Sequence, residues 1–209
     1  MIQNAGTLIL RDGSGRDRGS VVRGTEVYQE DDRGQYGHRE EVFAGCGAAL
    51  LLKRAMLEDV GLFDEDFFMY YEDMDLSWRA RRRGWKILFV PEAEVRHVHC
   101  GSSVEWSPLF LYHVERNRLL MLAKNASLGL AAAEHFKYAA SAGLNVGRLL
   151  RSLALRSADR SPLQRRLRIQ LQVLYWLVSH LSSTAAKRRQ LARRESVPAE
   201  KLLRWMVPA

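Results

Sequence analysis

The stretch from Gly61 to Trp85 reads GLFDEDFFMYYEDMDLSWRARRRGW. Six carboxylates lie among seven aromatic residues here, and three consecutive arginines follow them. Solvated runs of charge seldom carry so many large apolar rings. We interpret the stretch as one wall of a polar pocket, in which aromatic rings order the carboxylates and limit water. The alternative is an acidic surface helix whose apolar face packs on a core.

Short strands and helices are expected to alternate around this stretch. Gly61 and Gly84 each follow a helical pattern, in the position where glycine commonly ends a helix. The resulting order of elements is typical of an α/β layer. In chain order we expect a buried strand at 48–52, a helix at 54–60, a turn at 64–68, a helix at 70–83, a buried strand at 85–90 and a strand at 94–99.

Residues 1–40 are rich in glycine, aspartate and arginine, and only short apolar pieces such as 7–10 and 21–22 interrupt them. This pattern predicts strand fragments joined by long loops rather than a domain core. Mobile loops beside a binding cleft and plain disorder both fit it.

After Gly101 the apolar residues take helical spacing, over 108–125 and again over 131–157. A third helix is expected to begin at Ser161 as N-cap, with Pro162 at the first helical position. We therefore divide the chain into an α/β region, 1–125, and a basic amphipathic helical region, 126–209. The apolar face of the third helix would consist of Leu163, Leu167, Leu171, Leu174, Val178 and Leu181.

The segment 169–186 carries no formal charge, but its glutamines, serines and threonine make it too polar to span a membrane. We interpret it as part of a basic amphipathic helix that lies on a membrane surface. The alternative is a helix that packs on its own domain and exposes a solvated basic side. Trp205 near the end of the chain is a weak second indication of an interface.

The net charge of +8 is unevenly distributed. Residues 1–100 carry a net charge of −4 and residues 101–209 one of +12. An acidic half suggests a metal or proton site, and a basic half suggests an anionic partner, either membrane or nucleic acid. No nucleic-acid-binding motif is present, so we rank that partner low. Two distant cysteines without CxxC spacing are typical of reduced thiols in a cytoplasmic protein.

The carboxylates Glu72, Asp73 and Asp75 stand at the start of the expected helix at 70–83. Unpaired N–H groups and the positive end of the helix dipole keep carboxylates ionised there. Such a carboxylate can accept a proton from a hydroxyl or hold a divalent metal. Asp73 shares a face with Leu76, toward the expected core, whereas Asp75 points about 160° away on the helical wheel. Asp73 is therefore the better candidate for a chemical role, with N-terminal capping as the alternative.

A second group of candidate ligands is Arg96-His97-Val98-His99-Cys100. On a strand, His97 and His99 would share one face and reach one ligand. The spacing lacks the paired pattern of a zinc site, and Cys100 would face the other side. A structural role and a ligand role for the histidines both stay open at this point.

Residues 45–103 resemble the second half of the catalytic domain of family 2 glycosyltransferases, in particular the bacterial rhamnosyltransferase-like branch that builds cell-wall and surface polysaccharides. The likeness extends over about residues 4–125. Five pieces occur in the family's order: G-x-F-D-E, F-x-x-Y-x-E-D-x-D-L-x-x-R, a G-[WY] pair, V-P-x-A and a closing histidine. Each is weak alone, and the ordered set is specific.

The resemblance implies a partial GT-A fold followed by an α-helical C-terminal region, and inverting transfer from a nucleotide-sugar donor to a polysaccharide or lipid-linked hydroxyl acceptor. It implies that Asp73 is the general base and that His97 is a ligand of a Mn²⁺ or Mg²⁺ ion on the donor diphosphate. Glu72 and Asp75 would shape the acceptor pocket. The floor beneath the donor sugar and acceptor would consist of Gly45, Cys46, Gly47 and Ala48.

The family's nucleotide-binding half, with its D-x-D signature, has no counterpart in this sequence. We therefore expect either a truncated product or a partner chain that supplies this half, and we do not expect transfer by this chain alone. The alternative function is a non-catalytic remnant that docks on anionic membrane through its basic helices, from the cytoplasmic side.

Overall fold

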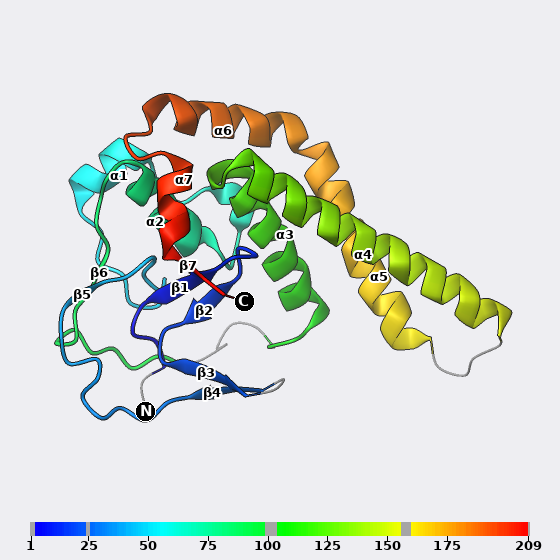
Figure 1. Ribbon diagram of the computed structural model, residues 1–209, viewed down its shortest axis with the longest axis horizontal. Helices are drawn as coiled ribbons and strands as arrows, with labels where there is room; N and C mark the ends of the chain where they lie inside the picture. The colour runs from blue at the N-terminus through cyan, green and yellow to red at the C-terminus, as the bar shows by residue number, and fades with distance from the viewer. Residues whose placement is uncertain (1–2, 24–25, 99–103, 156–159, 209) are drawn as a thin grey trace. The chain divides into compact units, whose positions relative to one another are not determined.

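The computed structural model describes residues 3–23, 26–98, 104–155 and 160–208 (Figure 1). The chain divides into two compact units, the first formed by residues 1–99 with 190–209 and the second by residues 100–189. Residue 125, where the sequence suggests a boundary between two regions, is the last residue of a helix in the second unit, and that boundary stays a prediction. The last twenty residues thus belong with the first unit.

The described residues of the first unit form three small sheets. In one, β1 (Thr7–Leu10) pairs antiparallel with β2 (Gly15–Asp17) and parallel with β7 (Met206–Val207). The others pair β3 (Ser20–Arg23) with β4 (Glu26–Gln29), and β5 (Glu40–Glu41) with β6 (Leu88–Phe89). The expected strand fragments at 7–10 and 21–22 are therefore confirmed.

The acidic-aromatic stretch folds largely as its sequence predicts. Helix α1 (Arg54–Val60) ends at Gly61, whose φ is 84°, and a 3-10 turn, η1 (Glu65–Phe67), follows. Helix α2 (Glu72–Arg82) ends two residues before Gly84, whose φ is 85°. Met56 of α1 packs with Leu76 and Ala80 of α2, and this contact fixes α2 in the unit.

Three expected strands are wrong or much shorter than expected. Residues 48–52 form a turn and loop, because Ala49 N–H bonds to the Cys46 carbonyl, and Leu51 is 99% exposed. The buried segment lies earlier, at Val42, Phe43 and Ala44. The strand expected at 85–90 shrinks to β6. Residues 94–98 are exposed and irregular, and residue 99 lies outside the described residues.

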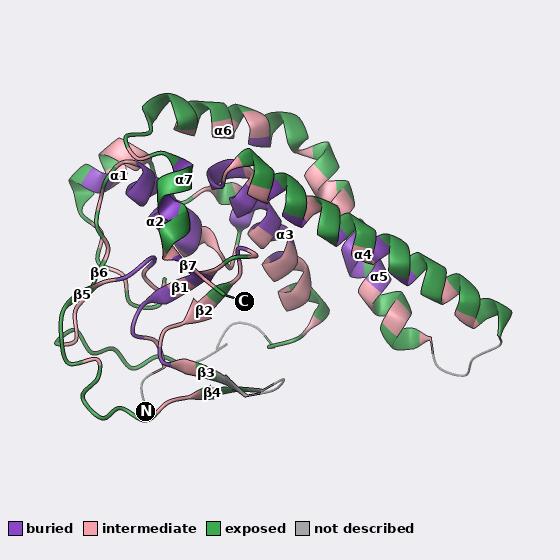
Figure 2. Cartoon of the chain, in the orientation of Figure 1, coloured by how far each residue is buried: buried purple, intermediate pink, exposed green. Residues whose placement is uncertain are grey.

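The second unit is helical. Helices α3 (Pro108–Asn125), α4 (Leu128–Ala154) and α5 (Ser161–Ser179) pack around a core of Leu119, Tyr138, Ile169 and Val173 (Figure 2). Serine N-caps begin α3 and α4, whereas Arg160, not Ser161, is the N-cap of α5. Among the described residues, no helix is both long and apolar enough to cross a bilayer.

The apolar face expected on α5 is only partly buried. Leu167 is buried, but Leu171 and Val178 are exposed, because the buried side is rotated toward Gln170 and Val173. Gln170 hydrogen-bonds to Asn145 and Ser141 of α4. The helix also ends at His180, and α6 (Leu181–Arg194) follows, with its last residues in the first unit. The remainder of the chain forms α7 (Ala199–Leu202) and the 3-10 turn η2 (Leu203–Trp205).

Candidate active site

The first turn of α2 holds Asp73 against the glycine-rich loop at 45–48. The Asp73 carboxylate accepts a hydrogen bond from the backbone N–H of Gly47, at 2.8 Å from Oδ2. It accepts a second from the N–H of Met74, at 2.7 Å from Oδ1. The two bonds orient the carboxylate and leave lone pairs on both oxygens for a further donor. The arrangement joins two segments 26 residues apart in the sequence.

Burial shapes the electrostatics of this turn. Burial raises the pKa of Asp73 above its usual range, while the hydrogen bonds from Gly47 and Met74 act in the opposite direction. Burial, and next the negative charge of Asp73, also raise the pKa of Glu72. Glu72 Oε2 is buried and has no hydrogen-bond partner among the described residues. A carboxylate with a raised pKa is a stronger base than a solvated aspartate.

The backbone just before α2 is strained. Phe68, Tyr70 and Tyr71 have φ values of 63°, 65° and 68°, a region that side-chain-bearing residues rarely adopt. Each such residue costs roughly 1–3 kcal/mol, and such residues cluster at functional sites. The Tyr71 hydroxyl accepts a hydrogen bond from the N–H of Gly15, at 3.3 Å, which helps to hold this conformation. This backbone conformation leads into the first turn of α2, which lies beside the glycine-rich loop.

The glycine-rich loop gives Asp73 a small neighbour. A Cβ atom on Gly47 would lie 3.4 Å from Asp73 Oδ2 and 3.7 Å from Glu72 Oε1. Gly47 therefore leaves open the space in front of both carboxylates. Cys46 beside it is half-buried, and burial raises the pKa of its thiol, so the group is neutral at pH 7. Ala48 is exposed at the turn.

The structure does not bring Asp75 to this group. Its carboxylate is 0% exposed and forms an ion pair with Arg79, with Oδ2 2.8 Å from Nε. Arg79 in turn donates to the carbonyls of Val60 and Leu62. The expectation that Asp75 points away from the core is therefore wrong, because an arginine one turn later neutralises it inside the protein. Asp73, which we expected on the core side, is only half-buried.

His97 lies outside the carboxylate group. It is exposed, and its Nδ1 lies 3.3 Å from Gln3 Oε1. In the part of the chain that the structure describes, no three His, Cys, Asp or Glu residues come together to hold a metal ion. The described residues thus do not form a complete metal centre. His97 as a ligand of Mn²⁺ or Mg²⁺ stays a prediction; His99 and Cys100 lie outside the described residues.

Comparison with known proteins bears on the same segment. Residues 25–119 match the family model described as "Glycosyltransferase like family 2". This segment is similar to the family 2 glycosyltransferases. It holds the glycine-rich loop, the strained aromatic residues and the whole of α2, so the candidate site lies inside the matched segment.

Two curated relatives come from strains of Mycobacterium tuberculosis, CDC 1551 / Oshkosh and ATCC 25618 / H37Rv. Each is named N-acetylglucosaminyl-diphospho-decaprenol L-rhamnosyltransferase and is 46% identical to this chain over 57 residues. The match covers 27% of this chain and 19% of the relative. No solved structure matches the chain.

The arginines that follow Asp75 connect α2 to other parts of the first unit. Arg81 Nε donates to the Phe43 carbonyl at 2.7 Å, and its guanidinium lies 3.9 Å from the centre of the Trp205 ring. Arg83 Nε lies 3.0 Å from Asp59 Oδ1. Local spacing could not reveal these roles, since Trp205 is distant in sequence. They link α2 to the strand-loop segment that carries Gly47 and to the end of the chain.

Proposed function

We propose that the segment takes part in inverting glycosyl transfer, from a nucleotide-sugar donor to a hydroxyl acceptor, with Asp73 as the general base. The observation that carries the proposal is the Asp73 carboxylate, oriented by the Gly47 and Met74 N–H groups and partly withdrawn from water. The match of residues 25–119 to the family 2 glycosyltransferase model supports the class of reaction.

In this proposal an Asp73 oxygen accepts the proton of the acceptor hydroxyl as that oxygen attacks the anomeric carbon. The bond from the anomeric carbon to the donor phosphate oxygen breaks, and the nucleoside diphosphate leaves with the electron pair. Attack from the face opposite the leaving group inverts the anomeric configuration. The raised pKa of Asp73 favours the proton transfer, because a catalytic base works best when its pKa lies near the operating pH.

The neighbours of Asp73 have positioning roles. Glu72, whose Oε1 lies beside the space that Gly47 leaves open, would accept a hydrogen bond from a second hydroxyl of the acceptor. The small residues at 45–48 would let the sugar approach the backbone closely, as Gly47 leaves the front of Asp73 open. Asp75 has no part in the acceptor pocket here, since it is buried against Arg79.

The substrates follow from the relatives. Their names specify L-rhamnose as the transferred sugar and an N-acetylglucosaminyl-diphospho-decaprenol as the acceptor. We propose substrates of the same two classes: a nucleotide-activated deoxyhexose or hexose, and a sugar carried on a diphospho-polyprenol. The role would be assembly of a cell-wall or surface polysaccharide on the cytoplasmic side of the membrane.

The test is transfer in extracts of the cells that make the protein, where any chain that supplies the nucleotide-binding part is present. Extracts receive nucleotide-activated L-rhamnose and N-acetylglucosaminyl-diphospho-polyprenol, and the anomeric configuration of the product is measured by NMR. The proposal expects a product that depends on this gene and has the inverted configuration. A product with retained configuration, or transfer that is unchanged after deletion of the gene, would contradict it.

A further inference from the structure

Helices α4 and α5 form an antiparallel hairpin with an open groove along one side. The groove has a volume of about 480 Å³. Its lining comes from these two helices alone: Leu149, Gln164, Leu167, Arg168, Leu171, Gln172 and Tyr175. The candidate active site contributes nothing to it, because that site belongs to the first unit.

Large apolar side chains continue the groove in both directions. On α4, Val146 and Leu153 lie in the same helical row as Leu149, three residues before it and four after it. On α5, Leu171, Tyr175 and Val178 form a row, with Tyr175 77% exposed and Val178 73% exposed. We call these six residues, together with Arg168, the hairpin face. Contiguous exposed apolar side chains of this kind are typical of an interaction site.

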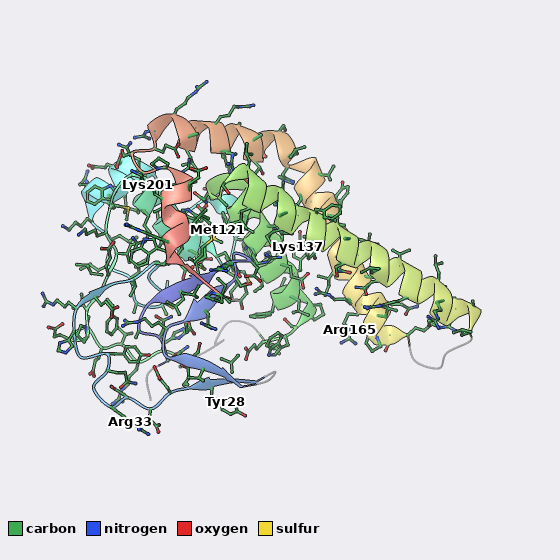
Figure 3. All side chains as sticks on the ribbon, in the orientation of Figure 1. Tyr28, Arg33, Met121, Lys137, Arg165 and Lys201 are labelled. Atoms are coloured by element: carbon green, nitrogen blue, oxygen red, sulfur yellow. The ribbon has the colours of Figure 1, made fainter. Side chains whose placement is uncertain are left out.

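The sequence around the hairpin face is rich in positive charge. Residues 144–171 carry seven arginines and a single acidic residue, Asp159. Arg166 is paired with Glu115 of α3. Arg165 and Arg168 are exposed, and no carboxylate of a described residue lies within ion-pair distance of either. Arg165, labelled in Figure 3, lies near the first residue of α5, Ser161.

We infer that the hairpin face docks on an anionic lipid bilayer. A bilayer surface takes both kinds of group at once, since leucine, valine and tyrosine enter the boundary between headgroups and acyl chains while arginines bind lipid phosphates. Tyrosine in particular favours this interface. Nucleic acid would satisfy the arginines but would leave the aliphatic rows of both helices in water. The sequence suggested that one amphipathic helix contacts the membrane, whereas the surface proposed here is formed by both α4 and α5.

The test is co-sedimentation of the full chain with vesicles, and it needs no sugar substrate, so its outcome does not depend on the proposed transfer. Vesicles contain either phosphatidylglycerol and phosphatidylcholine in equal parts, or phosphatidylcholine alone. We expect binding to the anionic vesicles that weakens with added salt. R165Q/R168Q should weaken it by roughly 10- to 30-fold, given the usual contribution of an arginine at an anionic surface.

Two further variants define the face. L171S/V178S removes apolar groups that are already exposed, so the fold should persist by circular dichroism, and vesicle binding should fall by roughly tenfold or more. The control R189Q/R193Q removes the same charge from exposed positions on α6 and should bind as the unmodified chain does.

Three results would overturn the inference. One is equal binding to neutral and anionic vesicles. Another is a loss of vesicle binding in R189Q/R193Q as large as that in R165Q/R168Q, which would mean that the whole chain is attracted diffusely and has no docking face. The third is tighter binding to duplex or single-stranded DNA than to anionic vesicles at the same salt concentration.

Discussion

Replacing Asp75 by asparagine should destabilise the first unit strongly, although the same change at Asp73, two residues earlier, should not. Both residues belong to one E-D-x-D motif, and helical facing alone places Asp73, not Asp75, toward the core. The structure separates them, because Asp75 is 0% exposed in an ion pair and Asp73 is half-buried at the start of the helix.

The magnitude follows from the surroundings of the pair. Asp75 Oδ2 lies 2.8 Å from Arg79 Nε, and Arg79 is only 5% exposed. Removing one partner of a buried ion pair leaves the other charge uncompensated and costs about 3–5 kcal/mol. Arg79 would keep its hydrogen bonds to the carbonyls of Val60, Gly61 and Leu62. We therefore expect the free energy of unfolding to fall by about 3 kcal/mol, the lower end of this range.

The assay is urea unfolding followed by tryptophan fluorescence, since Trp78 is buried in the same helix. Asp73→Asn is the matched control and should change the free energy of unfolding by less than about 1 kcal/mol, because Asp73 has already lost part of the benefit of ionisation. A loss below about 1 kcal/mol for Asp75→Asn, or equal losses for the two variants, would refute the assignment of Asp75 to the support of the fold.

Three other changes test the surroundings of the site. Gly47→Ala should lower transfer by about tenfold, since the new methyl group lies 3.4 Å from Asp73 Oδ2, while stability stays the same or rises by up to about 1 kcal/mol; unchanged transfer rates would contradict this. Trp205→Ala should cost about 2 kcal/mol in urea unfolding, because Arg81 loses its stacking partner; a loss under about 0.5 kcal/mol would show that the stack contributes little. Folding raises the pKa values of Glu72 and Asp73, so these groups stabilise the protein most when protonated, and that contribution is lost as the pH rises through their folded pKa values. Relative to E72Q/D73N, the wild-type chain should therefore be more stable near pH 4 than at pH 7, and the opposite trend would count against the burial of these carboxylates.

Helix ends were predictable because their causes are local. Gly61 and Gly84 adopt positive φ, and Ser107 with Pro108 begins α3. The candidate base was also within reach of sequence reasoning, since the dipole and free N–H groups of a helix start act on whichever carboxylate is there. A family resemblance then favoured Asp73 over its neighbours.

Burial was harder to predict, because it depends on partners elsewhere. The four-residue spacing of Asp75 and Arg79 was a visible signal for an ion pair. The burial of that pair was not visible in the sequence, because it depends on contacts of Arg79 with the carbonyls of Val60 and Leu62, which lie far from it in the sequence. Small residues at 45–47 suggested entry into a buried strand, whereas the chain turns there to meet Asp73. The pairing of Arg81 with Trp205 brings together distant segments that no local pattern relates.

In the proposed reaction Asp73 accepts the proton of the acceptor hydroxyl. The most direct measurement is the rate of sugar transfer in extracts of cells whose own gene copy carries Asp73→Asn, at protein levels matched to wild type by immunoblot. Asp66→Asn, in the turn before α2, is the control. We expect a loss of at least about 100-fold for Asp73→Asn, the usual contribution of general base catalysis, and near wild-type rates for the control. Retention of more than a few per cent of the activity by Asp73→Asn would contradict it.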